Sequence, residues 1–139
     1  MQFPGAPIKV GRELLAKKSP LQALVINNKV SNVCSGTPDG GISEAKLVCE
    51  SVAKSLDLSG GMDSVLPSST GVIGWRLPAK ELAEDVVPLA VQNLQSDSAL
   101  GAAEAICTTD RYPKLRCKTL SSGARITAFA KVCMYVYTH

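Results

Sequence analysis

The sequence LQALVIN, residues 21–27, decides the fold class because it is a short and nearly continuous apolar run. Runs of this length are typical of a strand that is covered on both faces. After a loop rich in Gly and Pro, apolar residues recur at intervals of three and four from Ile42 to Leu56, which predicts an amphipathic helix. Residues 64–67 predict a second short strand, which ends at a turn formed by Thr70 and Gly71. This order of strand, helix and strand predicts an α/β fold.

The second half of the chain predicts shorter elements. A helical pattern runs over residues 78–94, and Pro88 must kink or interrupt it because proline lacks a backbone N–H and its ring crowds the preceding turn. A short alanine-rich helix is expected over residues 99–106. Residues 115–120 and 125–130 flank a Ser-Ser-Gly sequence, which predicts a β-hairpin.

The composition favours a globular chain with a thin aliphatic core. The 139 residues are 45% apolar but only 4% aromatic. Fifteen basic and twelve acidic residues give a net charge of +3 and are spread along the chain, without the basic run that a nucleic-acid backbone attracts. No apolar stretch approaches the roughly 18 residues that a membrane-spanning helix needs. We therefore expect neither a nucleic acid nor a membrane as partner.

The cysteine pattern argues against a metal site and a cysteine nucleophile. No C-x-x-C spacing is present, and the single histidine is the last residue, His139, so both a zinc site and a Cys–His pair are disfavoured. We expect no bound metal. All five cysteines are expected to be reduced and mostly buried as small apolar side chains. They are Cys34, Cys49, Cys107, Cys117 and Cys133.

The segment SSTGVIG, residues 68–74, carries the first candidate site. A Thr hydroxyl and a backbone N–H in such a turn can donate hydrogen bonds to the negative charge that develops on a carbonyl oxygen during acyl transfer. The same composition is common in loops whose hydroxyls and glycines only satisfy the backbone. The residues by themselves leave both interpretations of Thr70 and Gly71 open.

Two further polar groups are candidates for substrate binding. The sequence Thr108-Thr109-Asp110 follows the short helix and offers two hydroxyls and a carboxylate, which could hold a polar substrate group or only satisfy helix carbonyls. Lys131 follows the last predicted strand, where most lysines are simply solvated. No Ser-His-Asp triad, pair of catalytic carboxylates or phosphate-binding glycine loop can be assembled from the chain.

Short motifs along almost the whole chain carry a family resemblance. They are Ala6-Pro7, Val10-Gly11-Arg12, ALVIN at 23–27, Asn32-Val33-Cys34-Ser35-Gly36, SSTGVIG at 68–74, Leu77-Pro78, AICTTD at 105–110, Tyr112-Pro113-Lys114 and Ala130-Lys131. In this order they resemble the glutamate N-acetyltransferase family, also called the ornithine acetyltransferase family. STGVIG followed by TTD and then AK at these intervals is the specific part of the match.

The resemblance implies an acetyltransferase of arginine biosynthesis that moves acetyl from N-acetylornithine to glutamate. Family members are made as one precursor, which cuts itself before a Thr that becomes the nucleophile of a β chain, and two α and two β chains form a heterotetramer. By this resemblance Thr70 and Gly71 form the oxyanion hole, while Thr108 and Lys131 contact the substrate. It implies no cofactor apart from the acetyl donor, which is N-acetylornithine or, in bifunctional members, acetyl-CoA. The implied fold is a layered α/β sandwich of mixed sheet and helices that is incomplete without the β chain.

The chain departs from the family pattern at both ends and in one loop. Residues 1–131 resemble the α-chain region, whereas residues 132–139 lack the family's Asn-Met-Ala-Thr cleavage site and form an atypical tail. The family's first strands would precede residue 3, so an α-chain region truncated at both ends is expected. Residues 28–31, Asn-Lys-Val-Ser, replace the family's Ser-Gly-Asn-Ala run, which argues against a close backbone approach there.

Several interpretations of the function stay open at this point. The chain is a working α chain that receives its nucleophile from a β partner, or a catalytically inactive truncated fragment or variant that binds the partner chain. A related N-terminal-nucleophile hydrolase is a third interpretation, because water can intercept the same acyl-enzyme. The resemblance implies the cytoplasm for a bacterial member and a plastid or mitochondrion for a eukaryotic one. Residues 132–139 favour the eukaryotic organelle, because they can be back-translated into GT and AT repeats like those of a read-through intron.

Overall fold

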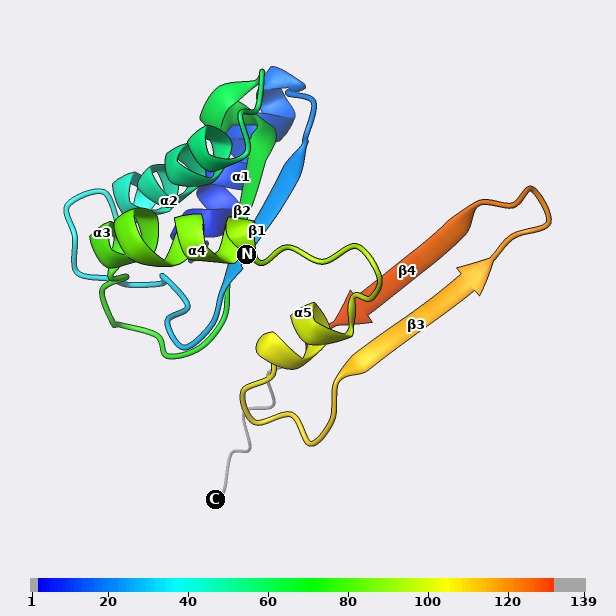
Figure 1. Ribbon diagram of the computed structural model, residues 1–139. Coiled ribbons are helices and arrows are strands. Elements are labelled where there is room, and N and C mark those ends of the chain that lie inside the picture. Colours follow the sequence, from blue (N-terminus) through cyan, green and yellow to red (C-terminus); the bar gives the residue numbers. More distant parts are fainter. Residues whose placement is uncertain (1–2, 132–139) are drawn as a thin grey trace. The chain divides into compact units, whose positions relative to one another are not determined.

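The computed structural model describes residues 3–131 and divides into two compact units, residues 1–94 and 95–139 (Figure 1). Both units contain helices and strands, so the fold is of the mixed α/β class that the sequence predicts.

The N-terminal unit is built on a two-stranded parallel sheet. β1 (Ala23–Asn27) pairs with β2 (Val65–Ser69) along its whole length, and α2 (Ile42–Ser55) lies in the connection between the strands. Parallel neighbours require such a crossover, because a tight turn cannot return the chain to the same end of the sheet. The other elements of this unit are α1 (Ala6–Lys17), a 3₁₀ turn (Gly61–Ser64), α3 (Ala79–Glu81), a π-helical turn (Leu82–Val86) and α4 (Val87–Gln92).

Two groups of buried apolar side chains hold this unit together. The larger group joins the sheet to α2 and to the segment of α3 and α4, and it includes the fully buried Val65 and the nearly fully buried Cys49. The smaller group joins α1 to α2 and β2. Its buried members are Ala6, Val10, Leu14 and Ala45.

The strands and the long helix are confirmed, but the expected burial of the first strand is wrong. Ala23 and Val25 pack against the core, whereas Leu24 points to the other side of the sheet and is 52% exposed. Successive side chains of a strand alternate between the two faces. The apolar run of residues 21–27 thus has one face against the core of this unit and one face on which Leu24 is exposed and Ile26 is half-buried.

The helix α1 is absent from the elements that the sequence analysis predicts. Ala6, Val10 and Leu14 are spaced by four residues and are all buried, so the helical period was a usable signal. Pro7 lies in the first turn, where its missing N–H costs no hydrogen bond. The N–H of Ala6 is satisfied by the carbonyl oxygen of Asn32 at 3.1 Å, which ties the start of α1 to a distant loop.

The predicted interruption at Pro88 is confirmed and takes the form of a π-helical turn. Residues 82–86 form this turn, and α4 then begins with Pro88 in its first turn. A proline inside a regular α-helix would leave a carbonyl without its donor and clash with it, so one wider turn relieves both problems. Ser51 of α2 donates to the carbonyl oxygen of Ala83 at 2.6 Å and holds the turn against α2.

The C-terminal unit contains a short helix and a hairpin. α5 (Leu100–Ala105) precedes β3 (Lys114–Thr119) and β4 (Arg125–Ala130), which pair antiparallel, as the sequence predicts. Ala103 and Ile106 are the buried apolar residues among the described part of this unit. Most hairpin side chains are exposed, so this unit offers little apolar burial of its own.

The cysteines are free in the described residues, but the expectation that most are buried is wrong. Only Cys49 is buried, and its burial raises the pKa of the thiol to about 12. Cys107 is half-buried, and Cys34 and Cys117 are exposed. Cys133 lies outside the described residues, as do His139 and the predicted tail at 132–139.

Within residues 3–131, no cluster of three His, Cys, Asp or Glu side chains could hold a metal ion. In the same part of the chain, no helix has the length and apolar character required to cross a membrane.

The two faces of the parallel sheet are expected to respond differently to mutation. Val65→Ala removes two methyl groups from a fully buried site and should lower the free energy of unfolding by about 2 kcal/mol. Leu24→Thr on the open face should change it by less than about 0.5 kcal/mol. Urea unfolding of the two variants measures the difference, and equal losses would contradict the burial described here.

Candidate functional site

The Thr70–Gly71 turn lies at the carboxyl end of the parallel sheet, directly after β2. The N–H of Thr70 donates to the carbonyl oxygen of Asn27 at 3.0 Å, which continues the strand pairing by one residue. In residues 3–131, the Thr70 hydroxyl and the Gly71 N–H have no hydrogen-bond acceptor. Both residues are half-buried. The carboxyl edge of a parallel sheet is where open α/β folds bind their ligands.

The loop of residues 28–31 runs alongside this turn at very close range. Val30 and Val72 form a parallel bridge, in which the Val72 N–H donates to the Lys29 carbonyl oxygen at 2.9 Å. Ser31 donates to the Val72 carbonyl oxygen twice, through its N–H at 3.0 Å and its hydroxyl at 2.8 Å. The sequence of residues 28–31 argued against a close backbone approach, and this expectation is therefore wrong.

Gly71 is required by this close approach. Its φ is +132°, and a β-carbon added there would lie 2.2 Å from the carbonyl carbon of Lys29 and 2.6 Å from its Cα. Backbone atoms cannot move aside as a flexible side chain can. A residue with a side chain is therefore excluded at this position for steric and conformational reasons.

Lys29 itself has a left-handed backbone, with a φ of +78°. Residues with a β-carbon adopt this region at a cost, and glycine does not. Its N–H donates to Asn28 Oδ1 at 2.6 Å, which helps to hold the conformation. The loop thus keeps its shape with a lysine where the backbone favours glycine.

A second cluster, in the C-terminal unit, is organised by Asp110. One carboxylate oxygen accepts a hydrogen bond from Lys114 Nζ at 2.5 Å. The other accepts one from Lys131 Nζ at 2.5 Å and one from the Thr108 N–H at 3.2 Å. Lys131 Nζ also donates to the Thr108 hydroxyl. The Asp110 side chain is 1% exposed, so these partners replace nearly all of its water.

The electrostatics of this cluster follow from its composition. Lys114, then Lys131 and the Thr108 N–H, hold the pKa of the Asp110 carboxyl well below its usual range. The hydrogen bond to Asp110 raises the pKa of Lys114. Among the described residues the cluster contains two ammonium groups and one carboxylate, and ammonium groups donate strong hydrogen bonds to carboxylate ligands.

The structure joins the predicted residues in two pairs. Thr70 and Gly71 are neighbours in the N-terminal unit, and Thr108 and Lys131 are hydrogen-bonded in the C-terminal unit. Sequence reasoning missed the central role of Asp110 and the part played by Lys114. The TTD motif and a cation four residues after its Asp were the available signals.

The motif at residues 32–36 has a structural role next to the candidate turn. Asn32 is fully buried, and its Nδ2 donates to the carbonyl oxygen of Gly41 at the start of α2, at 3.1 Å. Its own carbonyl oxygen accepts the Ala6 N–H at the start of α1. Asp39 accepts hydrogen bonds from Gly41 N–H at 3.0 Å and Ser43 N–H at 2.7 Å and so caps α2.

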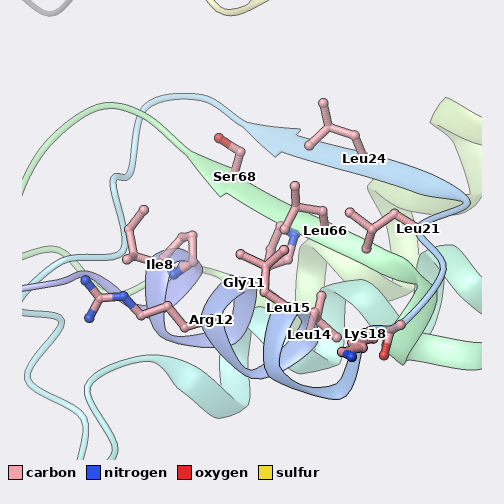
Figure 2. A pocket seen from close by; sticks show the side chains of 13 residues that line it. Ile8, Gly11, Arg12, Leu14, Leu15, Lys18, Leu21, Leu24, Leu66 and Ser68 are labelled. Atoms are coloured by element: carbon pink, nitrogen blue, oxygen red, sulfur yellow. The ribbon is translucent and has the colours of Figure 1, made fainter.

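A groove of about 640 Å³ lies along α1 and the open face of the sheet (Figure 2). Leu14 and Leu15 of α1 line it from one side, and Leu24 and Leu66 of the sheet, with Leu21 just before β1, line it from the other. Its lining is mainly aliphatic, and no acid–base pair faces it. We therefore regard it as an apolar surface of this unit and not as a site of chemistry.

Comparison with known proteins decides the family. A model described as the ArgJ family matches residues 1–134. The chain belongs to the ArgJ family. The mitochondrial "arginine biosynthesis bifunctional protein ArgJ" of Pyricularia oryzae is 40% identical over 124 residues, which cover 86% of this chain and 25% of that protein. The corresponding protein of Aspergillus oryzae is 37% identical over 126 residues, which cover 86% of this chain and 26% of that protein.

Two solved structures support the ArgJ assignment. An ornithine acetyltransferase of Mycobacterium tuberculosis, crystallised with ornithine, matches with a TM-score of 0.83 and 31% identity over 95% of this chain and 69% of its own. The ArgJ protein of Bacillus halodurans matches with a TM-score of 0.72 and 29% identity, over 99% of this chain and 70% of its own. The chain spans about a quarter of the length of the fungal ArgJ proteins that it matches.

The left-handed backbone of Lys29 predicts a stabilising mutation. Lys29→Gly should raise the free energy of unfolding by up to about 1 kcal/mol, because glycine relieves the strain at a small cost in chain entropy. Glu50→Gly, in the middle of α2, is the matched control and should lower it by about 1 kcal/mol. Urea unfolding measures both, and a loss of stability in Lys29→Gly would contradict the strain.

The pKa of Asp110 should depend on Lys114. Lys114→Met should raise this pKa towards its ordinary value of about 4, whereas Lys118→Met on the same strand should leave it unchanged. The measurement is an NMR titration of the Asp110 carboxyl. Because the folded-state pKa is lowered, the carboxylate stabilises the fold fully above pH values of about 4 and this stabilisation is lost as the pH falls through the lowered pKa. An unchanged titration in Lys114→Met would contradict the arrangement.

Proposed function

We propose that this chain is the α-chain part of an acetyltransferase of arginine biosynthesis, which moves acetyl from N-acetylornithine to glutamate. The observation that carries the proposal is the pair of donors at the carboxyl edge of the sheet, the Thr70 hydroxyl and the Gly71 N–H, which have no acceptor in the described part of the chain. Membership of the ArgJ family supports it, because relatives are named for arginine biosynthesis and ornithine acetyl transfer.

The reaction proceeds through an acyl-enzyme. The hydroxyl of an N-terminal Thr, supplied by a β chain, attacks the acetyl carbonyl of N-acetylornithine, and ornithine leaves with its amine protonated. The amine of glutamate then attacks the acetyl ester, which releases N-acetylglutamate and regenerates the Thr hydroxyl. Negative charge develops on the carbonyl oxygen in both steps. Thr70 and Gly71 donate to this oxyanion, and fixed donors of this kind each contribute about 100- to 1000-fold to the rate.

Thr108 and Lys131 serve in substrate binding. Both substrates carry carboxylates, which accept hydrogen bonds from ammonium and hydroxyl groups such as those of Lys131 and Thr108. The Asp110 carboxylate holds the Lys131 ammonium beside the Thr108 hydroxyl, so a carboxylate ligand meets a cation and a hydroxyl donor that are already placed. Fixing the long lysine side chain in advance lowers the entropic cost of binding.

The chain works with β chains in a heterotetramer of two α and two β chains, without a cofactor other than the acetyl donor. Acetyl-CoA is a second donor if the enzyme is bifunctional. The fungal relatives are mitochondrial proteins by name, which supports a mitochondrial location.

The test is acetyl transfer by the full chain combined with the β chain of a fungal family member. Production of N-acetylglutamate from N-acetylornithine and glutamate is expected. Thr70→Val, which removes the hydroxyl at constant shape, should lower kcat about 100-fold or more, while Thr70→Ser should keep most of the activity. Thr119→Ala, on the exposed hairpin, is the control and should have no effect.

Each outcome of this test has a separate meaning. A combination that binds but transfers no acetyl would favour the inactive fragment or variant over the enzyme. Hydrolysis of N-acetylornithine without transfer would favour the N-terminal-nucleophile hydrolase. Full activity of Thr70→Val would contradict only the role of Thr70 in the oxyanion hole. It would not contradict the proposed acetyltransferase activity.

A further inference from the structure

Asn27 is the last residue of β1 and makes three hydrogen bonds around the Thr70–Gly71 turn. Its Nδ2 donates to the carbonyl oxygen of Val30 at 2.7 Å. Its Oδ1 accepts a hydrogen bond from the hydroxyl of Ser69 at 2.5 Å, and its carbonyl oxygen accepts the Thr70 N–H at 3.0 Å. One half-buried residue thus joins the ends of both strands to the loop that follows β1.

The hydrogen bond to Val30 gives this loop its shape. It links the Asn27 side chain to a carbonyl three residues further on and brings the loop back beside Val72. The Lys29 carbonyl oxygen accepts the Val72 N–H there, and the Lys29 backbone lies so close to Gly71 that no β-carbon fits between them. Tightly packed atoms transmit a displacement directly, so a shift of the loop moves Gly71.

The Ser69 bond acts on the other side of the same turn. Ser69 is paired with Asn27 in the sheet register and directly precedes Thr70. A side chain here needs one donor for the Val30 carbonyl and one acceptor for the Ser69 hydroxyl, at fixed positions. A primary amide supplies both, a carboxylate lacks the donor, and an aliphatic side chain of the same size lacks both.

We propose that Asn27 is a positioning residue, whose side-chain amide fixes the directions of the Thr70 hydroxyl and the Gly71 N–H. This inference rests on the proposed function and deepens it. It also gives the last residue of the ALVIN motif a role in the site. Asn27 acts through the turn and does not touch the reacting atoms.

The kinetic test uses the full chain with a β chain, as above. Asn27→Ala should lower kcat about 10- to 100-fold at an unchanged KM for N-acetylornithine, because a misplacement of about one ångström costs this much. Asn93→Ala is the matched control and should leave kcat unchanged, since Asn93 directly follows α4 and its Nδ2 donates to the Leu89 carbonyl oxygen of that helix at 2.8 Å. Ser69→Ala removes one bond only and should give an intermediate decrease.

A double-mutant cycle separates positioning from loss of folding. If Asn27 acts through the turn, Asn27→Ala should cost much less activity in a Thr70→Val background than in the wild type. Thermal unfolding shows which variants are folded. If Asn27→Ala is not folded, Ser69→Ala takes its place in the cycle. Additive losses, or an unchanged kcat in Asn27→Ala and Ser69→Ala, would overturn the inference.

Failure of the proposed function gives a different result. If the wild type transfers no acetyl, the proposed function is wrong. The predicted effect of Asn27 on catalysis is then wrong too. The positioning is then decided by NMR, because Asn27→Ala should shift the amide resonances of Gly71 and Val72 while Asn93→Ala should not. Unchanged resonances in Asn27→Ala would overturn the positioning as well.

Discussion

The parallel pairing of β1 with β2, continued past the strand ends by the bridge between Val30 and Val72, is the constraint on which the N-terminal unit depends. It sets α2 as the crossover between the strands, and it places two loops side by side at one edge of the sheet. There Gly71 meets the backbone of Lys29 without room for a side chain. The pairing therefore produces both the core of the unit and the turn whose two donors, the Thr70 hydroxyl and the Gly71 N–H, have no acceptor among residues 3–131.

In the C-terminal unit, interactions between charged side chains are more prominent than apolar burial. It buries few apolar side chains, yet Asp110 is almost fully covered and is satisfied by Lys114, Lys131 and Thr108. A buried carboxylate is tolerated only when such partners compensate its lost hydration. In an enzyme of the ArgJ family, the same bonds would hold a cation and a hydroxyl ready for a substrate carboxylate. Charge pairing would then serve the fold and the site together.

Much of the fold could be predicted from local patterns, and the failures have identifiable causes. The period of α2, the apolar runs of the two strands and the hairpin are properties of adjacent residues, so the sequence predicts them correctly. The helix α1 was missed although Val10 and Leu14 carry its period. The open face at Leu24 could not be foreseen, because an apolar run does not show how many faces its surroundings cover. The relation of Lys29 to Gly71 joins residues 42 positions apart and has no local signal.

The sequence by itself determined the α/β class, the order of most elements, the family resemblance and the residue types of the candidate site, because each of these depends on short motifs and spacing. Only the tertiary structure decided that Asn27 is hydrogen-bonded to both Val30 and Ser69. It also decided that Asp110 is hydrogen-bonded to both Thr108 and Lys131. The exclusion of a side chain at Gly71 has the same origin. The physical reason is that hydrogen-bond direction and steric exclusion depend on the distance between atoms in space, which residues far apart in the chain acquire only when the strands have paired.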